Sequence, residues 1–111
     1  MTRWHKSIDQ EKWNTYPLET QILMVGSEFA RARALARDRA VAEVRLCFER
    51  AMELLDWCAG DPKWRGRLRE LTRFREMLGL AYLDAPGHDA LVVMLYRTLM
   101  SWTGTTSRVQ L

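Results

Sequence analysis

Residues 41–58, VAEVRLCFERAMELLDWC, decide the fold, because their apolar residues recur at alternating steps of three and four. This spacing places them on one side of an α-helix and predicts that this side packs against a core. The residues of this seam are Val41, Val44, Phe48, Ala51, Leu55 and Cys58. Leu46 and Trp57 fall on the opposite side, about 150 to 170° from the middle of the seam at roughly 100° per residue. We therefore expect another element, or another chain, to cover Leu46 and Trp57.

The composition is that of a single globular domain. With 111 residues, 48% of them hydrophobic and 28% charged, the chain is large enough to bury a core without metal or disulfide support. Its longest uninterrupted apolar run, residues 90–96, is too short to cross a bilayer, and its first residues lack the apolar run of a signal peptide. We therefore expect a cytoplasmic protein that does not engage a membrane.

Three further stretches show the same helical spacing. The first, residues 18–37, has its seam at Leu18, Ile22, Val25, Phe29, Ala32 and Ala36. The second, residues 62–83, is expected to bury Trp64, Leu68, Leu71, Phe74, Leu78 and Ala81. The third, residues 89–102, has its seam at Leu91 or Val92, Leu95, Leu99 and Trp102. The helix at 18–37 also carries apolar residues on its outer side, namely Leu23, Met24 and Leu35.

Cap and turn residues separate these helices. Gly60 is typical of a helix end, and Asp61-Pro62 is typical of a helix start. A turn near Asp38, preferred over one continuous helix, and a break at 84–87 supply the other connections. Four comparable helices with short links predict an all-α fold, an antiparallel four-helix bundle over residues 17–102.

The two ends of the chain are expected to differ in order. Residues 1–16 predict an N-terminal arm with a short helix, whose apolar side carries Trp4 and Trp13. Such a helix is too short to be stable alone, so the arm is expected to pack on the bundle or on a partner, where it is the first candidate to cover the outer side of 41–58. Residues 103–111 have small polar side chains without periodicity, so we expect a flexible tail.

The sequence contains none of the common catalytic or cofactor-binding patterns. It has no G-x-S-x-G, Gly-rich phosphate loop, H-E-x-x-H or C-x-x-C. His5 and His88 are the only histidines, and neither has an acid or cysteine at metal-ligand spacing. Cys47 and Cys58 lie eleven residues apart on one predicted helix, too far apart to pair within it. We therefore expect no enzymatic activity, no cofactor and no metal.

The succession EFARARALARDRAVAEVRLCFERAMELL, residues 28–55, is faintly similar to HEPN-type helical bundles. That resemblance implies a helical bundle that commonly dimerises, in a family whose members often cut or bind RNA. The HEPN nuclease signature is an Arg followed by a His at a separation of four to six residues. No His stands at that distance from Arg73 or Arg75, so the resemblance does not extend to nuclease activity.

Two functions are compatible with these features. The leading hypothesis is a non-enzymatic bundle that acts through protein association, most simply as a homodimer. Its candidate interface residues are Leu46, Trp57, Leu54, Met24, Leu35, Trp4 and Trp13. The alternative is nucleic-acid binding through Arg65, Arg69 and Arg73, which are spaced at i, i+4 and i+8, with further arginines at 31, 33 and 37.

Arg67 and Arg75 fall within or beside the apolar stripe of the 62–83 helix. An unpaired charge there would be strongly destabilising, so each must find an acid, a backbone carbonyl or water. The candidate acids are Glu28, Glu49, Asp84 and Asp89. A structural ion pair is preferred over a ligand-anion site, but if a pocket is present, these two arginines are expected to line it.

Overall fold

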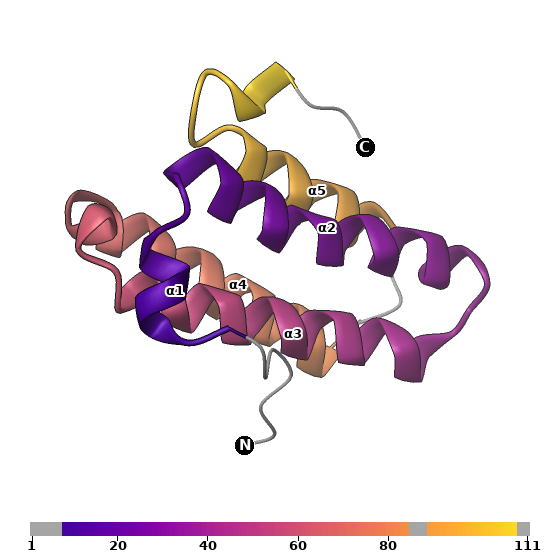
Figure 1. Ribbon diagram of the computed structural model, residues 1–111. Helices are drawn as coiled ribbons and strands as arrows, with labels where there is room; N and C mark the ends of the chain where they lie inside the picture. Colours follow the sequence, from indigo (N-terminus) through magenta and orange to yellow (C-terminus); the bar gives the residue numbers. More distant parts are fainter. Residues whose placement is uncertain (1–7, 85–88, 109–111) are drawn as a thin grey trace.

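The computed structural model describes residues 8–84 and 89–108, and their regular structure is entirely helical (Figure 1). The α-helices are α1 (Gln10–Asn14), α2 (Leu18–Arg37), α3 (Val41–Ala59), α4 (Leu68–Asp84) and α5 (Asp89–Met100). Two 3₁₀ helices, η1 (Pro62–Arg67) and η2 (Thr106–Arg108), precede α4 and follow α5. The expected all-α class is confirmed, with five α-helices in the described parts of the chain.

The long helices lie in two layers, α2 beside α5 and α3 beside α4 (Figure 1). The most extensive packing joins α2 to α3 across the layers, followed by α2 with α5 and α3 with α4. Three phenylalanines meet in the core between them. The ring of Phe29 on α2 lies 6.1 Å from that of Phe48 on α3 and 5.9 Å from that of Phe74 on α4, in the latter case edge to face. Such aromatic pairs contribute about 0.5–1.5 kcal/mol beyond their buried area.

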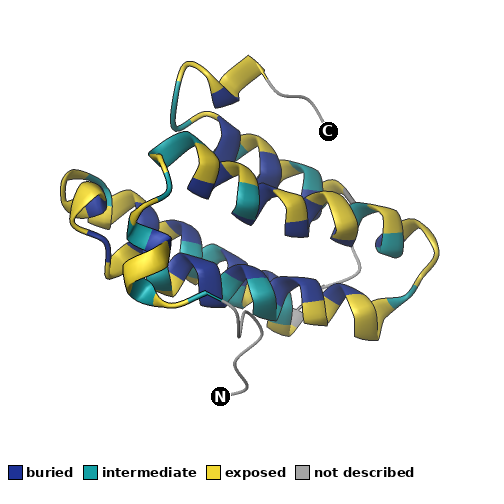
Figure 2. Ribbon diagram, in the orientation of Figure 1, coloured by how far each residue is buried: buried dark blue, intermediate teal, exposed yellow. Residues whose placement is uncertain are grey.

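Most of the seam predicted for α2 and α3 is buried, as Figure 2 shows along the facing sides of the layers. Leu18, at the start of α2, is only half-buried. Two further positions differ from the prediction. Val41, in the first turn of α3, is 43% exposed, while Leu54, placed on the outer side, is buried. The buried side of α3 is wider than one seam because the helix packs against α2, α4 and η1.

The helix expected over residues 62–83 begins differently. Pro62–Arg67 form a 3₁₀ helix, and the α-helix starts only at Leu68. A 3₁₀ helix has 3.0 residues per turn instead of 3.6, so residues before the junction are rotated relative to those after it. Leu68, predicted to share a buried side with Trp64, is 40% exposed as a result. From Leu71 onward the predicted core residues Leu71, Phe74, Leu78 and Ala81 are buried.

The turn between α2 and α3 confirms the expected break near Asp38. The amide of Arg39 donates to the carbonyl of Ala36 at 3.0 Å, and that of Ala40 donates to Leu35 at 3.0 Å. These are the two hydrogen bonds of a Schellman motif, whose residue after the cap has a left-handed backbone. Arg39 occupies that position with φ 56°, although glycine is the residue usually found there.

Replacing Arg39 with glycine is expected to stabilise the fold. A non-glycine residue in the left-handed region costs about 1–2 kcal/mol, partly offset by the greater freedom of glycine in the unfolded chain. Arg39→Gly should therefore raise the free energy of unfolding by about 0.5–1 kcal/mol in a urea titration. Arg39→Ala, which keeps the strained conformation, is the matched control and should show no gain. An equal gain in both variants would show that the charge of Arg39, and not its backbone, is unfavourable.

Gly26 allows α2 and α5 to pack closely. A Cβ placed there would lie 2.7 Å from the terminal methyl carbon of Met100 and 3.3 Å from the ring of Tyr96. Both contacts are shorter than ordinary van der Waals separations. Gly26 therefore lies at the contact between α2 and α5, as expected of a glycine inside a helix.

The arm packs on the helices of its own chain. Asp9 caps α1, its carboxylate accepting a hydrogen bond from the amide of Lys12 at 2.7 Å. Trp13 is fully buried, and its carbonyl accepts a hydrogen bond from Gln21 of α2 at 2.8 Å. The predicted residue Trp4 lies outside the described residues. The described part of the arm therefore packs on α2 of its own chain through Trp13.

The first part of the tail, which was expected to be flexible, contacts the end of α5. Thr106 is fully buried, and its hydroxyl donates to the carbonyl of Met100 at 2.7 Å. Thr103 also bonds the backbone amide of Thr106 at 3.0 Å. These side chains form hydrogen bonds with backbone groups that a helix end leaves unpaired. Such bonds follow no period along the sequence, so periodicity did not predict them.

Candidate functional site

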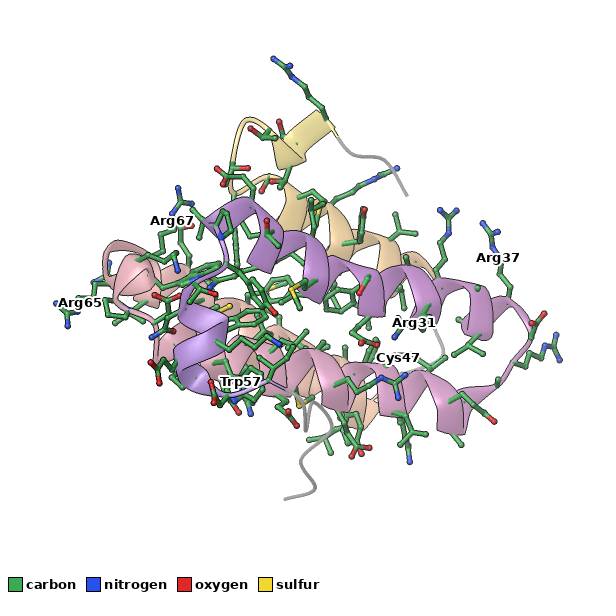
Figure 3. All side chains as sticks on the ribbon, viewed as in Figure 1. Arg31, Arg37, Cys47, Trp57, Arg65 and Arg67 are labelled. Atoms are coloured by element: carbon green, nitrogen blue, oxygen red, sulfur yellow. The ribbon has the colours of Figure 1, made fainter. Side chains whose placement is uncertain are left out.

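Part of the outer side of α3, around Trp57, is covered within one chain. The rings of Trp13 and Trp57 meet edge to face, with centroids 5.9 Å apart. Gln10 of α1 donates to the carbonyl of Trp57 at 2.9 Å, and Figure 3 shows Trp57 beside α1. Trp57 is thereby half-buried. The arm, predicted as the first candidate to cover this side, does contact Trp57.

Several candidate interface residues are not available to a partner. Trp13 and Leu54 are buried in the core, so their assignment to an interface was wrong. Met24 and Leu35 are half-buried and pack against the core. Leu46 is 36% exposed, so the cover expected over it is not complete. On these two long helices, Leu23 on α2 is also exposed, at 42%, as are Val41 and Leu46 on α3.

Arg75 forms an ion pair with a residue that the sequence did not suggest. Its Nε lies 2.6 Å from Oδ1 of Asp56 on α3, and its Nη2 lies 3.1 Å from Oδ2. This two-pronged hydrogen bond to Asp56 raises the pKa of Arg75, although partial burial opposes it. The preferred structural ion pair is present, with Asp56 instead of the candidates Glu28 and Glu49 as its acid; the side chains of the other two candidates, Asp84 and Asp89, lie outside the described residues.

Arg67 is satisfied by the backbone. Its Nη1 donates to the carbonyl of Trp102 at 2.7 Å, joining the end of η1 to the segment that follows α5. A backbone carbonyl was one of the partners considered for Arg67. Neither of the two hollows described below is lined by Arg67 or Arg75, so the expectation that these residues line a pocket is not met there.

Glu28 is the most buried acid of the α2–α3 contact. Its Oε1 lies 2.9 Å from Nη1 of Arg31 and 3.0 Å from Nε of Arg50. Arg50 also donates to the sulfur of Cys47 at 3.3 Å. Burial raises the pKa of the Cys47 thiol, and it also raises the pKa of Cys58. Both cysteines are fully buried, so they act as small hydrophobic residues and not as reactive thiolates.

The acid Glu49 belongs to a contact between α3 and α4. The hydroxyl of Tyr82 donates to Oε2 of Glu49 at 3.1 Å, and the guanidinium of Arg45 lies 5.8 Å from the centre of the Tyr82 ring. Burial, then the neighbouring carboxylate, raise the pKa of Tyr82. Because Tyr82 faces α3, its neighbours Leu80 and Leu83 are turned toward other sides of α4.

A buried polar cluster ties the arm to the α3–α4 connection. The amide nitrogen of Gln21 donates to Oδ2 of Asp61 at 2.7 Å as well as to the arm, and its oxygen accepts the indole N–H of Trp64 at 2.6 Å. Lys63 donates to the same carboxylate through its backbone and its ammonium group, at 3.0 and 2.6 Å. Burial alone would raise the pKa of Asp61, but these hydrogen bonds and the charge of Lys63 outweigh it, so the pKa is lowered.

The Asp61 carboxylate should make folding sensitive to acid. A lowered pKa means that its contribution is present above the unfolded value near 3.8 and is lost as the pH falls through the folded value. We expect the free energy of unfolding, measured by urea titration, to fall as the pH drops below about 4. Asp61→Asn should weaken this acid dependence, whereas Glu11→Gln on the exposed side of α1 should leave it unchanged. Identical acid dependence in Asp61→Asn and the wild type would contradict the assignment.

Among the residues that the structure describes, the most exposed leucines lie on the outer side of α4. Leu80 is 61% exposed and Leu83 is 72% exposed. Next to them is a shallow hollow of about 420 Å³ lined by Leu68, Arg69, Thr72, Arg73 and Glu76. Sequence reasoning did not single out Leu80 or Leu83, although Leu80 lies seven residues after Arg73 and so on the same helix face.

The three arginines of the nucleic-acid hypothesis are exposed but do not form one row. Arg69 and Arg73 share the outer face of α4. Arg65 lies in η1, where the 3₁₀ geometry rotates it away from the i, i+4 alignment expected for a continuous α-helix. Figure 3 shows Arg65 at the end of the molecule formed by η1.

A second, smaller hollow of about 140 Å³ lies between α4 and α5. It is lined by Glu70, Arg73, Phe74, Met77, Thr98 and Trp102. The rings of Phe74 and Trp102 meet there with centroids 5.2 Å apart. These two helices pack less closely than α2 with α3, which leaves the depression open.

In residues 8–84 and 89–108, no three or more His, Cys, Asp and Glu side chains lie together in a way that could hold a metal ion. No helix in the same part of the chain is both long and apolar enough to cross a membrane.

The fold and the outer face of α4 define a small all-α domain with leucines exposed beside a shallow hollow. No known protein family, no curated protein and no solved structure matches the chain.

Proposed function

We propose that this protein is a non-enzymatic four-helix bundle that acts by associating with another protein chain, in the simplest case a second copy of itself. The observation that carries the proposal is the exposure of Leu80 and Leu83, 61% and 72%, on one side of α4. Large apolar side chains exposed together on one helix face support an interaction surface, because contiguous exposed apolar patches mark such sites. The supporting surface differs from the one predicted around Trp57, since the arm contacts that residue in cis.

The proposed bundle consists of α2, α3, α4 and α5. The packing of α2 with α3, α2 with α5 and α3 with α4 supports a ring of four helices, each antiparallel to the next in sequence. In such a ring every long helix keeps one side free of the core. The proposed location is the cytoplasm, as expected from the sequence.

Sedimentation velocity over a concentration series tests the homodimer. We expect the weight-average mass to rise from 13.0 kDa toward twice that value with increasing concentration. Association through apolar contacts should change little between low and high salt, because salt screens charges but does not weaken apolar burial. A mass that stays at one chain over the whole series contradicts homodimerisation.

Nucleic-acid binding is the second candidate. Its supporting observation is that Arg69 and Arg73 are both exposed on the outer face of α4, with Arg65 exposed nearby on η1. If these residues contact phosphates, affinity for single-stranded RNA or duplex DNA should fall steeply with salt. Replacing all three by glutamine should then reduce the salt slope by about one unit per lost contact. Fluorescence anisotropy with both probes measures this, and we expect no binding at physiological salt.

A further inference from the structure

The hollow on α4 has the arrangement that receives a side chain from another helix. Arg69, Thr72, Arg73 and Glu76, which line it, stand at i, i+3, i+4 and i+7. In packed helix pairs, each inserted side chain enters a hole formed by four residues of this spacing. Thr72, the smallest of the four, leaves room at the centre. The hollow is therefore suited to a single apolar side chain from a facing helix.

The same helix also carries side chains of the right kind. Leu80 follows Thr72 by eight residues, roughly 12 Å along the axis at 1.5 Å per residue. It projects from the same outer face and is 61% exposed. One surface thus presents both a projecting leucine and a hollow, displaced along the helix.

We propose that α4 packs antiparallel against α4 of a second copy, with Leu80 of each chain in the Arg69–Glu76 hollow of the other. This inference rests on the proposed function and specifies the partner and the surface. A two-fold axis is the arrangement that fills both hollows at once, because each chain then gives and receives the same contact. A different protein would need a projecting apolar side chain and a hollow of its own at the same spacing, whereas a second copy carries both.

The charges of the face fit this register. When Leu80 of the partner opposes Thr72, Arg73 lies at the level of Gly79 of the partner. Glu76 then lies near the two-fold axis, opposite Glu76 of the partner. A Cβ placed at Gly79 meets nothing within 4 Å, so no side chain of the same chain crowds this part of α4. Arg73 is then displaced from Glu76 of the partner by three residues, roughly 4.5 Å along the helix axis. The two Arg73–Glu76 pairs related by the two-fold axis offset the repulsion between the two Glu76 carboxylates.

Leu83 has a counterpart in the same register. It opposes Arg69 of the partner, whose aliphatic stem can cover the leucine while the guanidinium remains in water. In this register each exposed leucine therefore has a contact on the partner: Leu80 in the hollow and Leu83 on the stem of Arg69. A parallel arrangement would instead place Arg73 against Arg73 and leave both hollows empty.

The first test replaces Leu80 with glutamate in the full chain. We expect the dissociation constant of the dimer to rise at least tenfold in sedimentation velocity, because a charge then enters each hollow. Met94→Glu, which changes another exposed apolar residue on the outer side of α5, should change the constant less than twofold. Far-UV circular dichroism should be unchanged in both variants, since neither residue belongs to the buried core.

The second test addresses the antiparallel register. Arg73→Glu and Glu76→Arg should each weaken the dimer, and the double exchange should restore the wild-type constant to within about threefold, because it recreates both ion pairs. Glu76→Cys, next to the axis, should form a disulfide-linked dimer under mild oxidation, whereas Arg65→Cys on η1 should not. Cys47 and Cys58 are buried and do not compete.

Each outcome decides a separate question. A wild-type dimer that Leu80→Glu does not weaken overturns the α4 surface but leaves the proposed association intact. A dimer that Leu80→Glu does weaken, without rescue by the double exchange and without cross-linking at residue 76, overturns the antiparallel register. A chain that is monomeric at every concentration overturns both this inference and the homodimeric function.

Discussion

Replacing Gln21 with alanine should lower the free energy of unfolding by about 3–5 kcal/mol, the largest loss expected from any polar residue of this protein. Gln21 is fully buried and makes three hydrogen bonds to three different segments: the carbonyl of Trp13 in the arm, the carboxylate of Asp61 before η1 and the indole of Trp64. Its removal leaves all three partners without this bond in a site that water does not reach. A buried polar group that loses its partner costs about 1–3 kcal/mol.

Urea titration of two variants separates hydrogen bonding from packing. Gln21→Met retains most of the side-chain volume but none of the hydrogen bonds, so it should lose nearly as much stability as Gln21→Ala. Thr20→Ala, an exposed change on the same helix turn, is the control and should alter stability by less than about 0.5 kcal/mol. If Gln21→Met is as stable as the wild type, the Gln21 side chain stabilises the fold through its packing and not through its hydrogen bonds.

Trp13→Ala should cost about 3–5 kcal/mol, the range for truncating a large buried aromatic residue. The indole is fully buried, and its ring meets those of Tyr16 and Trp57 at centroid separations of 5.9 Å. The five-residue helix α1 cannot persist without its packing, so loss of this anchor should release the arm as well. Trp57 would then become more exposed to solvent.

Tryptophan fluorescence and urea titration together measure this effect. Release of the arm should shift the emission of the remaining tryptophans to longer wavelength and increase quenching by iodide under native conditions. Lys12→Ala, an exposed residue of α1, should change neither signal. A loss below about 1 kcal/mol without a change in quenching would mean that the arm is not an integral part of the fold.

Helical periodicity correctly predicted the buried sides of α2 and α3 and most of that of α4. Ile22, Phe29, Phe48 and Leu55 are all buried where their spacing placed them. This agreement arises because an α-helix repeats every 3.6 residues, so a sequence with that apolar period can bury only one side. The prediction was wrong at Leu68, since a 3₁₀ segment changes the period and sequence spacing does not indicate which helix type will form.

The partners of the charged residues could not be predicted in the same way. Arg75 pairs with Asp56, nineteen residues earlier on α3, and Arg67 binds the carbonyl of Trp102. Such contacts depend on how two helices are rotated and shifted against each other, which neither helix specifies alone. The candidate association surface was missed for the same reason. The outer sides of α2 and α3 carry large apolar residues in the sequence, but Leu54 is buried in the core and Trp57 contacts the arm, whereas Leu80 and Leu83 on α4 are the more exposed leucines.

The sequence by itself determined the helical class, the positions of the turns at Asp38 and Gly60, and the side of each long helix that faces the core, because all three depend on interactions between residues close together in the chain. Only the tertiary structure decided that the arm contacts Trp57, that Gln21 joins three segments, and that Leu80 and Leu83 remain exposed. The physical reason is that the exposure of a side chain is fixed by whatever packs above it, and those neighbours come from distant parts of the sequence.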